Sequence, residues 1–217
     1  MSAREKILAR IRKAQGRGGR GPSQAELEAL DTYLRAHPRG PLPPVEGDLV
    51  ARFRARAESM QSTTEEIAAE ADAPTAVARY LRANALPLAG CVWPDLADLD
   101  WKSAGLALEA RAAVGDDMVG VTGAFAAIAE TGTLMLASGP GTPATVSLLP
   151  ETHVAILSAE RIVAYMEEAW DLARDAFGQL PRAVNFISGP SRTADIEHQL
   201  VMGAHGPYRV HIVIVRG

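Results

Sequence analysis

A carboxylate and two hydroxyl groups lie together in a stretch that is otherwise apolar. Positions 127–133 read Ala-Ile-Ala-Glu-Thr-Gly-Thr, and Glu130 is the one ionisable residue between positions 119 and 138. A buried carboxylate is costly unless it is paired or hydrogen-bonded, so its presence here needs a reason. We predict that Glu130 is catalytic, as a base or a nucleophile. The ligand contacts predicted beside it are Thr131, Gly132 and Thr133. The alternative is that Glu130 caps the turn or pairs with Arg192.

A second polar cluster, at positions 187–197, follows an apolar run that predicts a strand. In open α/β sheets, ligands bind beyond the carboxyl ends of the strands, where loop N–H groups and helix N-termini meet anionic groups. The predicted ligand-binding residues are Ser188, Gly189, Ser191, Arg192, Thr193, Asp195 and Glu197. Arg192 would bind a carboxylate in a bidentate manner. The alternative is helix capping by Ser191 or Thr193, which does not require Arg192.

A histidine lies in a turn of small residues, Gly-Ala-His-Gly-Pro, at positions 203–207. The pKa of an imidazole is readily tuned near neutrality, so we predict His205 as the second catalytic residue, for proton transfer or ligand contact. The alternative is a surface histidine without a role. His198 and His205 lack the spacing of a helical metal pair, so we predict no metal site and assign no cofactor to the chain.

A glycine- and proline-rich run, Gly-Pro-Gly-Thr-Pro at positions 139–143, follows another predicted strand. Its glycine content is typical of a phosphate cradle, but it lacks the lysine and the spacing of a P-loop. We therefore consider this run a weaker candidate for a binding site than the three polar clusters.

The composition of the 217-residue chain is that of a globular protein, with 47% hydrophobic and 22% charged residues. The formal net charge of -4 and the 5% aromatic content argue against nucleic acid as a partner. No apolar run approaches the ~18 residues of a membrane span. The basic N-terminus also lacks the apolar segment of a secretory signal. We therefore expect a cytoplasmic protein without a membrane span.

Cys91 is the single cysteine of the chain. One cysteine excludes an intramolecular disulfide, a zinc site built on paired cysteines and an iron–sulfur cluster held by four thiolates of this chain. We predict that Cys91 is a small core residue. Any redox centre that works with this chain would have to be supplied by another protein.

The sequence divides at a proline-rich stretch, positions 37–47. Before it, amphipathic patterns predict helices over 3–15 and 23–34. We predict a basic N-terminal helical extension with a Pro-rich linker over 1–48, followed by an α/β domain over 49–217. Residues 1–20 hold seven basic side chains against one acidic side chain. This basic arm predicts either a docking element for an acidic partner or a solvated helical tail.

Helices and short apolar runs alternate after this linker, which is typical of a layered α/β fold. Helices are predicted over 49–60, 72–82, 160–177 and 191–202. Strands are predicted over 88–93, 106–110, 153–157, 183–187 and 210–215, and the block 119–138 is predicted as strands joined by tight turns. Positions 62–69 suit either a short strand or a helix.

Four separated motifs resemble the LUD domain of the lactate utilisation protein C family, over roughly the last hundred residues. They are Gly120–Ala124 with Ala127–Thr133, Leu148–Pro150 with His153-Val154, Ile187–Ser191 with Thr193–Glu197, and Gly203 with His205–Pro207. The resemblance implies a three-layer α/β/α sandwich of the NagB/RpiA/CoA-transferase-like type. Some enzymes of that group use a glutamate as nucleophile or base, which bears on Glu130 by fold analogy alone.

The resemblance also implies a function. It suggests a subunit of a lactate-utilisation system that oxidises L-lactate to pyruvate together with iron–sulfur partner proteins, and a small anionic ligand for the predicted site. One alternative is a free-standing enzyme like a CoA transferase or a folate cyclo-ligase, acting on a small carboxylate or phosphorylated ligand. Another alternative is a non-catalytic structural or regulatory subunit.

Overall fold

The computed structural model describes residues 2–16, 21–196 and 199–217, with the side chains at 194–196 and 199–202 left aside. Within these residues the chain forms two compact units, Met1–Leu42 and Pro43–Gly217. No helix of the described residues is long and apolar enough to cross a lipid bilayer.

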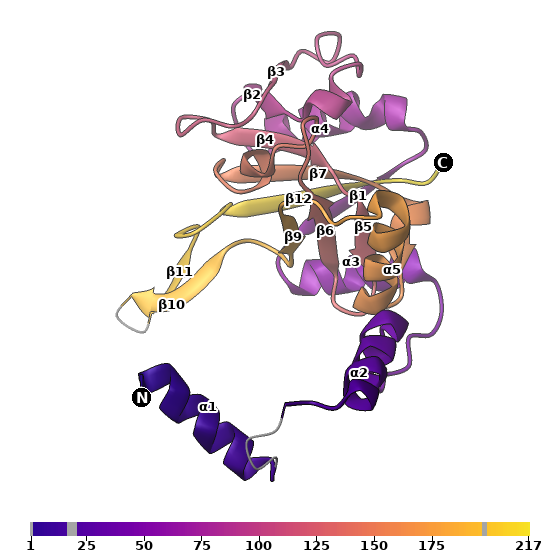
Figure 1. Ribbon diagram of the computed structural model, residues 1–217. Coiled ribbons are helices and arrows are strands. Elements are labelled where there is room, and N and C mark those ends of the chain that lie inside the picture. The colour runs from indigo at the N-terminus through magenta and orange to yellow at the C-terminus, as the bar shows by residue number, and fades with distance from the viewer. Residues whose placement is uncertain (1, 17–20, 197–198) are drawn as a thin grey trace. The chain divides into compact units, whose positions relative to one another are not determined.

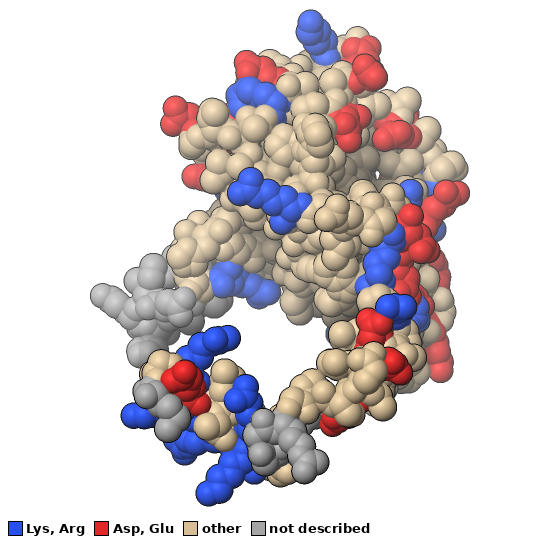
Figure 2. Space-filling model, viewed as in Figure 1, with Lys and Arg blue, Asp and Glu red and all other residues tan. Residues whose placement is uncertain are grey.

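The N-terminal unit consists of two helices, α1 (Ala3–Ala14) and α2 (Gln24–Ala36). Each begins with a capping box, in which Ser2 and Ser23 exchange hydrogen bonds with the glutamate three residues later. Neither helix buries a residue. Lysine and arginine side chains gather on α1 (Figure 2). The two predicted N-terminal helices are confirmed.

The second unit is built on a six-stranded parallel sheet with the order β1-β12-β7-β4-β2-β3 (Figure 1). The strands are β1 (Thr63–Ile67), β2 (Ala89–Val92), β3 (Ala107–Ala110), β4 (Val119–Gly123), β7 (Thr152–Ser158) and β12 (Arg209–Val215). The three strands β12, β7 and β4 are buried along nearly their whole length. A parallel strand covered on both faces needs such a continuous apolar run, and this explains the uninterrupted pattern that predicted these strands.

A smaller, mixed sheet packs beside β7, with the order β8-β5-β6-β9. Its strands are β5 (Ala126–Ile128), β6 (Thr133–Ala137), β8 (Ile162–Val163) and β9 (Val184–Ile187). Strands β5 and β6 form an antiparallel hairpin, and the turn between them carries Glu130. The uncharged block 119–138 is therefore divided between the two sheets.

Three helices flank the sheets: α3 (Leu49–Ser59), α4 (Ala73–Ala83) and α5 (Met166–Phe177). Helix α4 packs on β1 and β12, whereas α5 packs on β5 and β8 (Figure 1). Helix α3 contacts both β1 and β8 and so links the two sheets. Short 3-10 turns complete the unit: η1 (Glu70–Asp72), η2 (Pro94–Leu96), η3 (Ala144–Ser147) and η4 (Ala159–Arg161). The predicted α/β class is confirmed, with a central parallel sheet flanked by helices.

Two predicted helices are wrong in part or in whole. The helix predicted over 160–177 begins only at Met166, because Ile162 and Val163 pair as a strand with Ala127 and Ile128. Residues 191–202, predicted as mainly helical, contain the antiparallel strands β10 (Arg192–Ile196) and β11 (Gln199–Met202). β-Branched residues favour such pairing over a helix. The open segment 62–69 contains β1.

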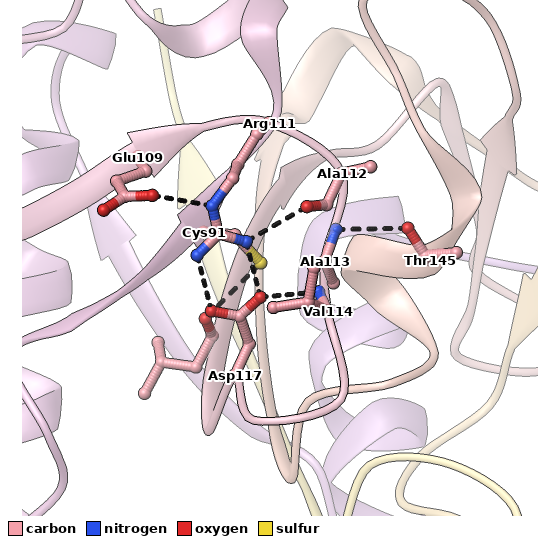
Figure 3. Close-up of polar contacts among 9 residues, drawn as sticks. Cys91, Glu109, Arg111, Ala112, Ala113, Val114, Asp117 and Thr145 are labelled. Atoms are coloured by element: carbon pink, nitrogen blue, oxygen red, sulfur yellow. Dashed lines mark hydrogen bonds and ion pairs between the residues drawn. The ribbon is translucent and has the colours of Figure 1, made fainter.

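A buried carboxylate holds the loop between β3 and β4 (Figure 3). Asp117 accepts two hydrogen bonds from the Arg111 guanidinium, at 2.6 and 2.9 Å, and a third from the Val114 N–H at 2.7 Å. The Arg111 guanidinium holds the pKa of Asp117 below its usual value. Cys91 lies beside this loop with its Sγ 3.7 Å from the Val119 carbonyl, and burial raises the pKa of its thiol to about 12. Cys91 is buried, which confirms the prediction that it is a core residue.

Candidate functional site

The two predicted catalytic residues line different cavities. Glu130 lies in a cavity of about 420 Å³, whereas His205 lies in one of about 590 Å³. The first cavity, which we call the arginine pocket, is lined by Pro43, Arg52, Arg56, Met60, Glu130, Thr131 and Ser188. It combines three of the predicted site residues with two arginines.

Three elements meet at the arginine pocket. The turn between β5 and β6 supplies Glu130 and Thr131, and the end of β9 supplies Ser188. Helix α3 supplies Arg52 and Arg56, which are four residues apart and therefore lie on one helix face. The pocket is thus formed by segments that are about 80 and 60 residues apart in the chain.

Gly132 explains how the turn after β5 can lie directly against α3. Its φ is +69°, and an added Cβ would be 2.4 Å from the backbone nitrogen of Ala57. No L side chain fits that space. Thr131 Oγ1 donates to Thr133 Oγ1 at 2.8 Å. Thr133 itself is buried, so of the two predicted threonines it is Thr131 that lines the cavity.

Gly189 has the same role in the loop after β9. Its φ is +79°, and an added Cβ would be 2.1 Å from the carbonyl oxygen of Met60, just beyond the end of α3. Ser188 is thereby held at the pocket. Arg192 Nη2 lies 3.8 Å from Met60 Sδ, which places Arg192 beside a wall of the pocket.

The remaining residues of the predicted ligand-binding loop lie around β10. Ser191 donates its N–H to the Pro207 carbonyl and accepts from the Gly203 N–H, both at 2.9 Å, which joins it to the turn that carries His205. Thr193 and Asp195 belong to β10. Glu197 lies outside the described residues.

The arginine pocket carries an unbalanced charge. Two arginines, Arg52 and Arg56, line it together with one acidic residue, Glu130. Arg52 Nε is buried, and no described group hydrogen-bonds to it. Within the described chain, no hydrogen bond or ion pair joins Glu130 to Arg192, the partner considered for it above. Excess positive charge with a free N–H donor suits a small anion, and a guanidinium binds a carboxylate through two parallel hydrogen bonds.

One wall of the arginine pocket is tied to the start of α5. The Tyr165 hydroxyl donates to the Pro43 carbonyl at 2.7 Å and accepts from the Val45 N–H at 3.2 Å. Tyr165 is the residue before α5, where Glu168 accepts its backbone N–H. This tie fixes the segment that includes Pro43 on the second unit.

His205 lies near the amino ends of two strands of the six-stranded sheet, whereas the arginine pocket lies at the carboxyl end of β9. Its cavity includes Glu151 and Arg209, at the amino ends of β7 and β12. The Arg209 guanidinium stacks over the Tyr208 ring at 4.8 Å. The structure therefore does not bring His205 into the arginine pocket with Glu130. No cluster of three or more metal-ligating side chains is found in the portion of the chain that is described.

Arg52 and Arg56 are functional candidates that the sequence analysis missed. The apolar residues of 49–60 predict a helix with one buried face, and that face is indeed buried at Val50, Phe53 and Ala57. Two arginines four residues apart are a signal of a shared charged face. That signal does not say which other segments meet this face.

Comparison with known proteins places this architecture. The model of the LUD domain family matches residues 50–215. The chain belongs to the LUD domain family. The crystal structure of a DUF162 family protein from Deinococcus radiodurans superposes with a TM-score of 0.61 at 21% identity. The superposed region covers 80% of this chain and 100% of the Deinococcus chain. At this level of identity the match supports a shared fold and nothing further.

Curated relatives of this LUD-domain chain carry the name Lactate utilization protein C. The proteins from Exiguobacterium sp. and Bacillus subtilis are 45% and 40% identical over 101 and 100 residues, which is 45% of this chain in each case. The protein from Bacillus licheniformis is 34% identical over 134 residues, 57% of this chain. These matches span 44%, 42% and 53% of the three relatives, so the chain matches about half of their length.

Proposed function

We propose that this LUD-domain chain is a cytoplasmic subunit of a lactate-utilisation system that oxidises L-lactate to pyruvate together with iron–sulfur partner proteins. We further propose that the arginine pocket binds the carboxylate of a small 2-hydroxy or 2-oxo acid. The pairing of Arg52 and Arg56 with Glu130 in one cavity is the observation that carries this proposal. The names of the relatives support the choice of lactate.

The residues of the pocket have separate roles in this proposal. The guanidinium groups of Arg52 and Arg56 bind the carboxylate, and hydroxyl groups of Thr131 and Ser188 orient the substituent at C2. Glu130 accepts the proton of the substrate hydroxyl as a general base. The hydrogen at C2 leaves as a second proton, and the two electrons pass to the iron–sulfur partners, so both are taken up outside this chain. Proton transfer by His205 is restricted to a ligand bound in its own cavity.

A calorimetric titration of the full chain with L-lactate, pyruvate and neutral lactamide tests the pocket. Lactate and pyruvate should bind saturably and lactamide should not, since only the acids offer a carboxylate. Arg52→Gln and Arg56→Gln should each weaken binding at least tenfold, because each removes a charge-assisted contact. Arg54→Gln is the matched control on the same helix, since Arg54 bonds to Thr64 and Glu66 and lies outside the pocket. Unchanged binding by both pocket variants would remove the proposed ligand site.

A second experiment addresses the proposed system. The tagged chain is purified from the native organism grown on lactate, and the eluate is assayed for iron–sulfur proteins and for lactate oxidation. Recovery of both supports the subunit role. Glu130→Gln should then recover the same partners with much less oxidation. Recovery of the chain alone contradicts the subunit role and favours a solitary ligand-binding enzyme.

A further inference from the structure

A third cavity lies where ligands bind in open parallel sheets. It measures about 560 Å³ and includes Trp93, Gly123 and Phe125. Trp93 follows the last residue of β2, and Gly123 is the last residue of β4. The cavity therefore lies beyond the carboxyl ends of two adjacent parallel strands, and its size is that of a small-molecule site.

Aromatic side chains form much of the wall of this cavity. The rings of Phe125 and Phe177 contact each other with their centroids 4.8 Å apart, and both line the cavity with Trp93. The Trp93 ring is fixed by its Nε1–H, which donates to the Pro143 carbonyl at 3.0 Å. Flat apolar surfaces of this kind bind a planar ring by stacking and edge contacts. We call this cavity the aromatic pocket.

One carboxylate faces the aromatic pocket. Among the described lining residues, Asp95 is the only one that carries a charge at neutral pH. Its N–H donates to the Gly141 carbonyl at 3.2 Å, and a Cβ added to Gly141 would lie 1.6 Å from Asp95 Oδ1. The glycine therefore leaves the space that this carboxylate occupies. The run 139–143, considered above as a phosphate cradle, therefore lies against a negatively charged hydrogen-bond acceptor, the carboxylate of Asp95.

Both side-chain hydroxyls that line the aromatic pocket are engaged in the fold. Thr142 Oγ1 donates to the Ala137 carbonyl at 2.8 Å, and Ser138 Oγ accepts from the Ala183 N–H at 2.9 Å. Asp95 is thus the one charged acceptor among the described residues that line the pocket. A negative carboxylate repels anions. The aromatic pocket therefore disfavours the anionic ligands that the arginine pocket favours.

We propose that the aromatic pocket binds a planar heteroaromatic ring with adjacent N–H donors, of which guanine is the clearest instance. The ring lies against Trp93, Phe125 and Phe177, and the two oxygens of Asp95 accept two parallel N–H donors. This site is independent of the proposed lactate function. The β5–β6 hairpin separates the two pockets, because Phe125 and Ser138 flank its open end whereas Glu130 lies in its turn.

Titration of the full chain with guanosine, followed by calorimetry, tests this proposal. Guanosine should bind saturably, and Asp95→Asn should weaken it at least tenfold. The control Asp98→Asn, three residues further along an exposed loop, should bind as the unaltered chain does. Phe177→Leu should also weaken binding, which separates loss of the ring from loss of the charge.

The probe 1-methylguanosine sharpens the test, because its methyl group removes one of the two adjacent donors. It should bind at least tenfold more weakly than guanosine to the unaltered chain and equally weakly to Asp95→Asn. Arg52→Gln should leave guanosine binding unchanged, so the fate of the arginine pocket does not decide this result. The proposal is overturned if guanosine shows no saturable binding up to its solubility limit, or if Asp95→Asn binds it as tightly as the unaltered chain.

Discussion

Asp117 gains its stabilising role from its three hydrogen-bond donors. A carboxylate that accepts a bidentate guanidinium and a backbone N–H is favoured in its charged form, which is why the pKa of Asp117 lies below its usual value. Its contribution to stability is complete above the ordinary aspartate pKa of ~3.9 and is lost as the pH falls through the lower native pKa. The loop between β3 and β4 is also held by the Ala113 N–H, which donates to Thr145 Oγ1 at 3.2 Å (Figure 3).

Asp117→Asn should lower the free energy of unfolding by about 1–3 kcal/mol at pH 7, because Arg111 loses its bidentate partner and keeps Glu109 as its ion-pair partner, while the loop stays hydrogen-bonded at Val114. Urea denaturation measures this change. Asp116→Asn is the matched control, since Asp116 is the neighbouring residue and its side chain is exposed. A loss in Asp116→Asn as large as that in Asp117→Asn would show that the effect is not specific to the ion pair.

Two buried histidines make the fold sensitive to mild acid. His153 is fully buried with Nε2 2.8 Å from Thr122 Oγ1, and burial lowers its pKa to about 4. Burial similarly lowers the pKa of His211, which stacks on Tyr80, to about 4. Between the ordinary histidine pKa of ~6.5 and 4, the unfolded chain binds protons that the folded chain does not. The free energy of unfolding should therefore fall across this interval.

Urea denaturation at pH 7, 6 and 5 should show this loss, which reaches up to about 3 kcal/mol per histidine near pH 4. His153→Gln should flatten the slope with pH, whatever its stability at pH 7. His37→Gln, at the exposed end of α2, should leave the slope unchanged. A free energy of unfolding that stays constant between pH 6.5 and 5 would contradict this account.

At the scale of elements, α3 is the support on which both candidate turns rest. The turns at Gly132 and Gly189 approach its backbone so closely that neither tolerates a Cβ. Their glycines therefore determine the spacing between the helix with its arginines and the two turns with Glu130 and Ser188. A small displacement of either turn changes the shape of the arginine pocket.

Gly132→Ala should destabilise the protein by more than Gly178→Ala, although both glycines have a similar positive φ, +69° and +63°. Nothing lies within 4 Å of a Cβ added to Gly178, so that variant carries the backbone cost of its positive φ without a steric clash. Gly132→Ala adds the clash with α3 and should also weaken lactate binding. Equal midpoints in thermal unfolding for the two variants would show that α3 yields to the added methyl group.

The pattern of apolar residues predicted most of these elements, because long buried strands and amphipathic helices leave a regular signal. Strand β8 has only two residues, too short for a period to be visible, so it was merged with the helix that follows. The segment 191–202 combines capping residues with β-branched ones, and its pairing as β10 and β11 depends on contacts with the 203–207 turn. Glu130, Thr131 and Ser188 are predicted as site residues from two separate clusters. The arginines of α3 are not predicted, since close approach through glycine is a property of three dimensions.

At the scale of the whole molecule, the two units differ in what stabilises them. The unit from Pro43 onward contains the apolar core, whereas α1 and α2 bury no residue. Burial of apolar surface is the main stabilising contribution in a globular fold. The extension therefore adds little to the stability of the second unit, and the basic residues of α1 are exposed.

Deletion of residues 1–42 should leave the thermal midpoint of the second unit within a few degrees of that of the full chain, as measured by circular dichroism. The same deletion should weaken recovery of acidic partner proteins, and added salt should weaken recovery by the full chain, because screening reduces attraction between exposed charges. Normal partner recovery by the truncated chain would dismiss the basic arm as a docking element.

The Tyr165 hydroxyl has a consequence that extends along the chain. It anchors Pro43, which is at once a wall of the arginine pocket and the first residue of the second unit. Any displacement of the linker that moves Pro43 would also move this wall of the pocket. A partner that pulls on the extension would therefore change the affinity of the pocket, and by reciprocity an occupied pocket would change the affinity for the partner by the same factor. One phenolic hydroxyl would then couple assembly to ligand binding.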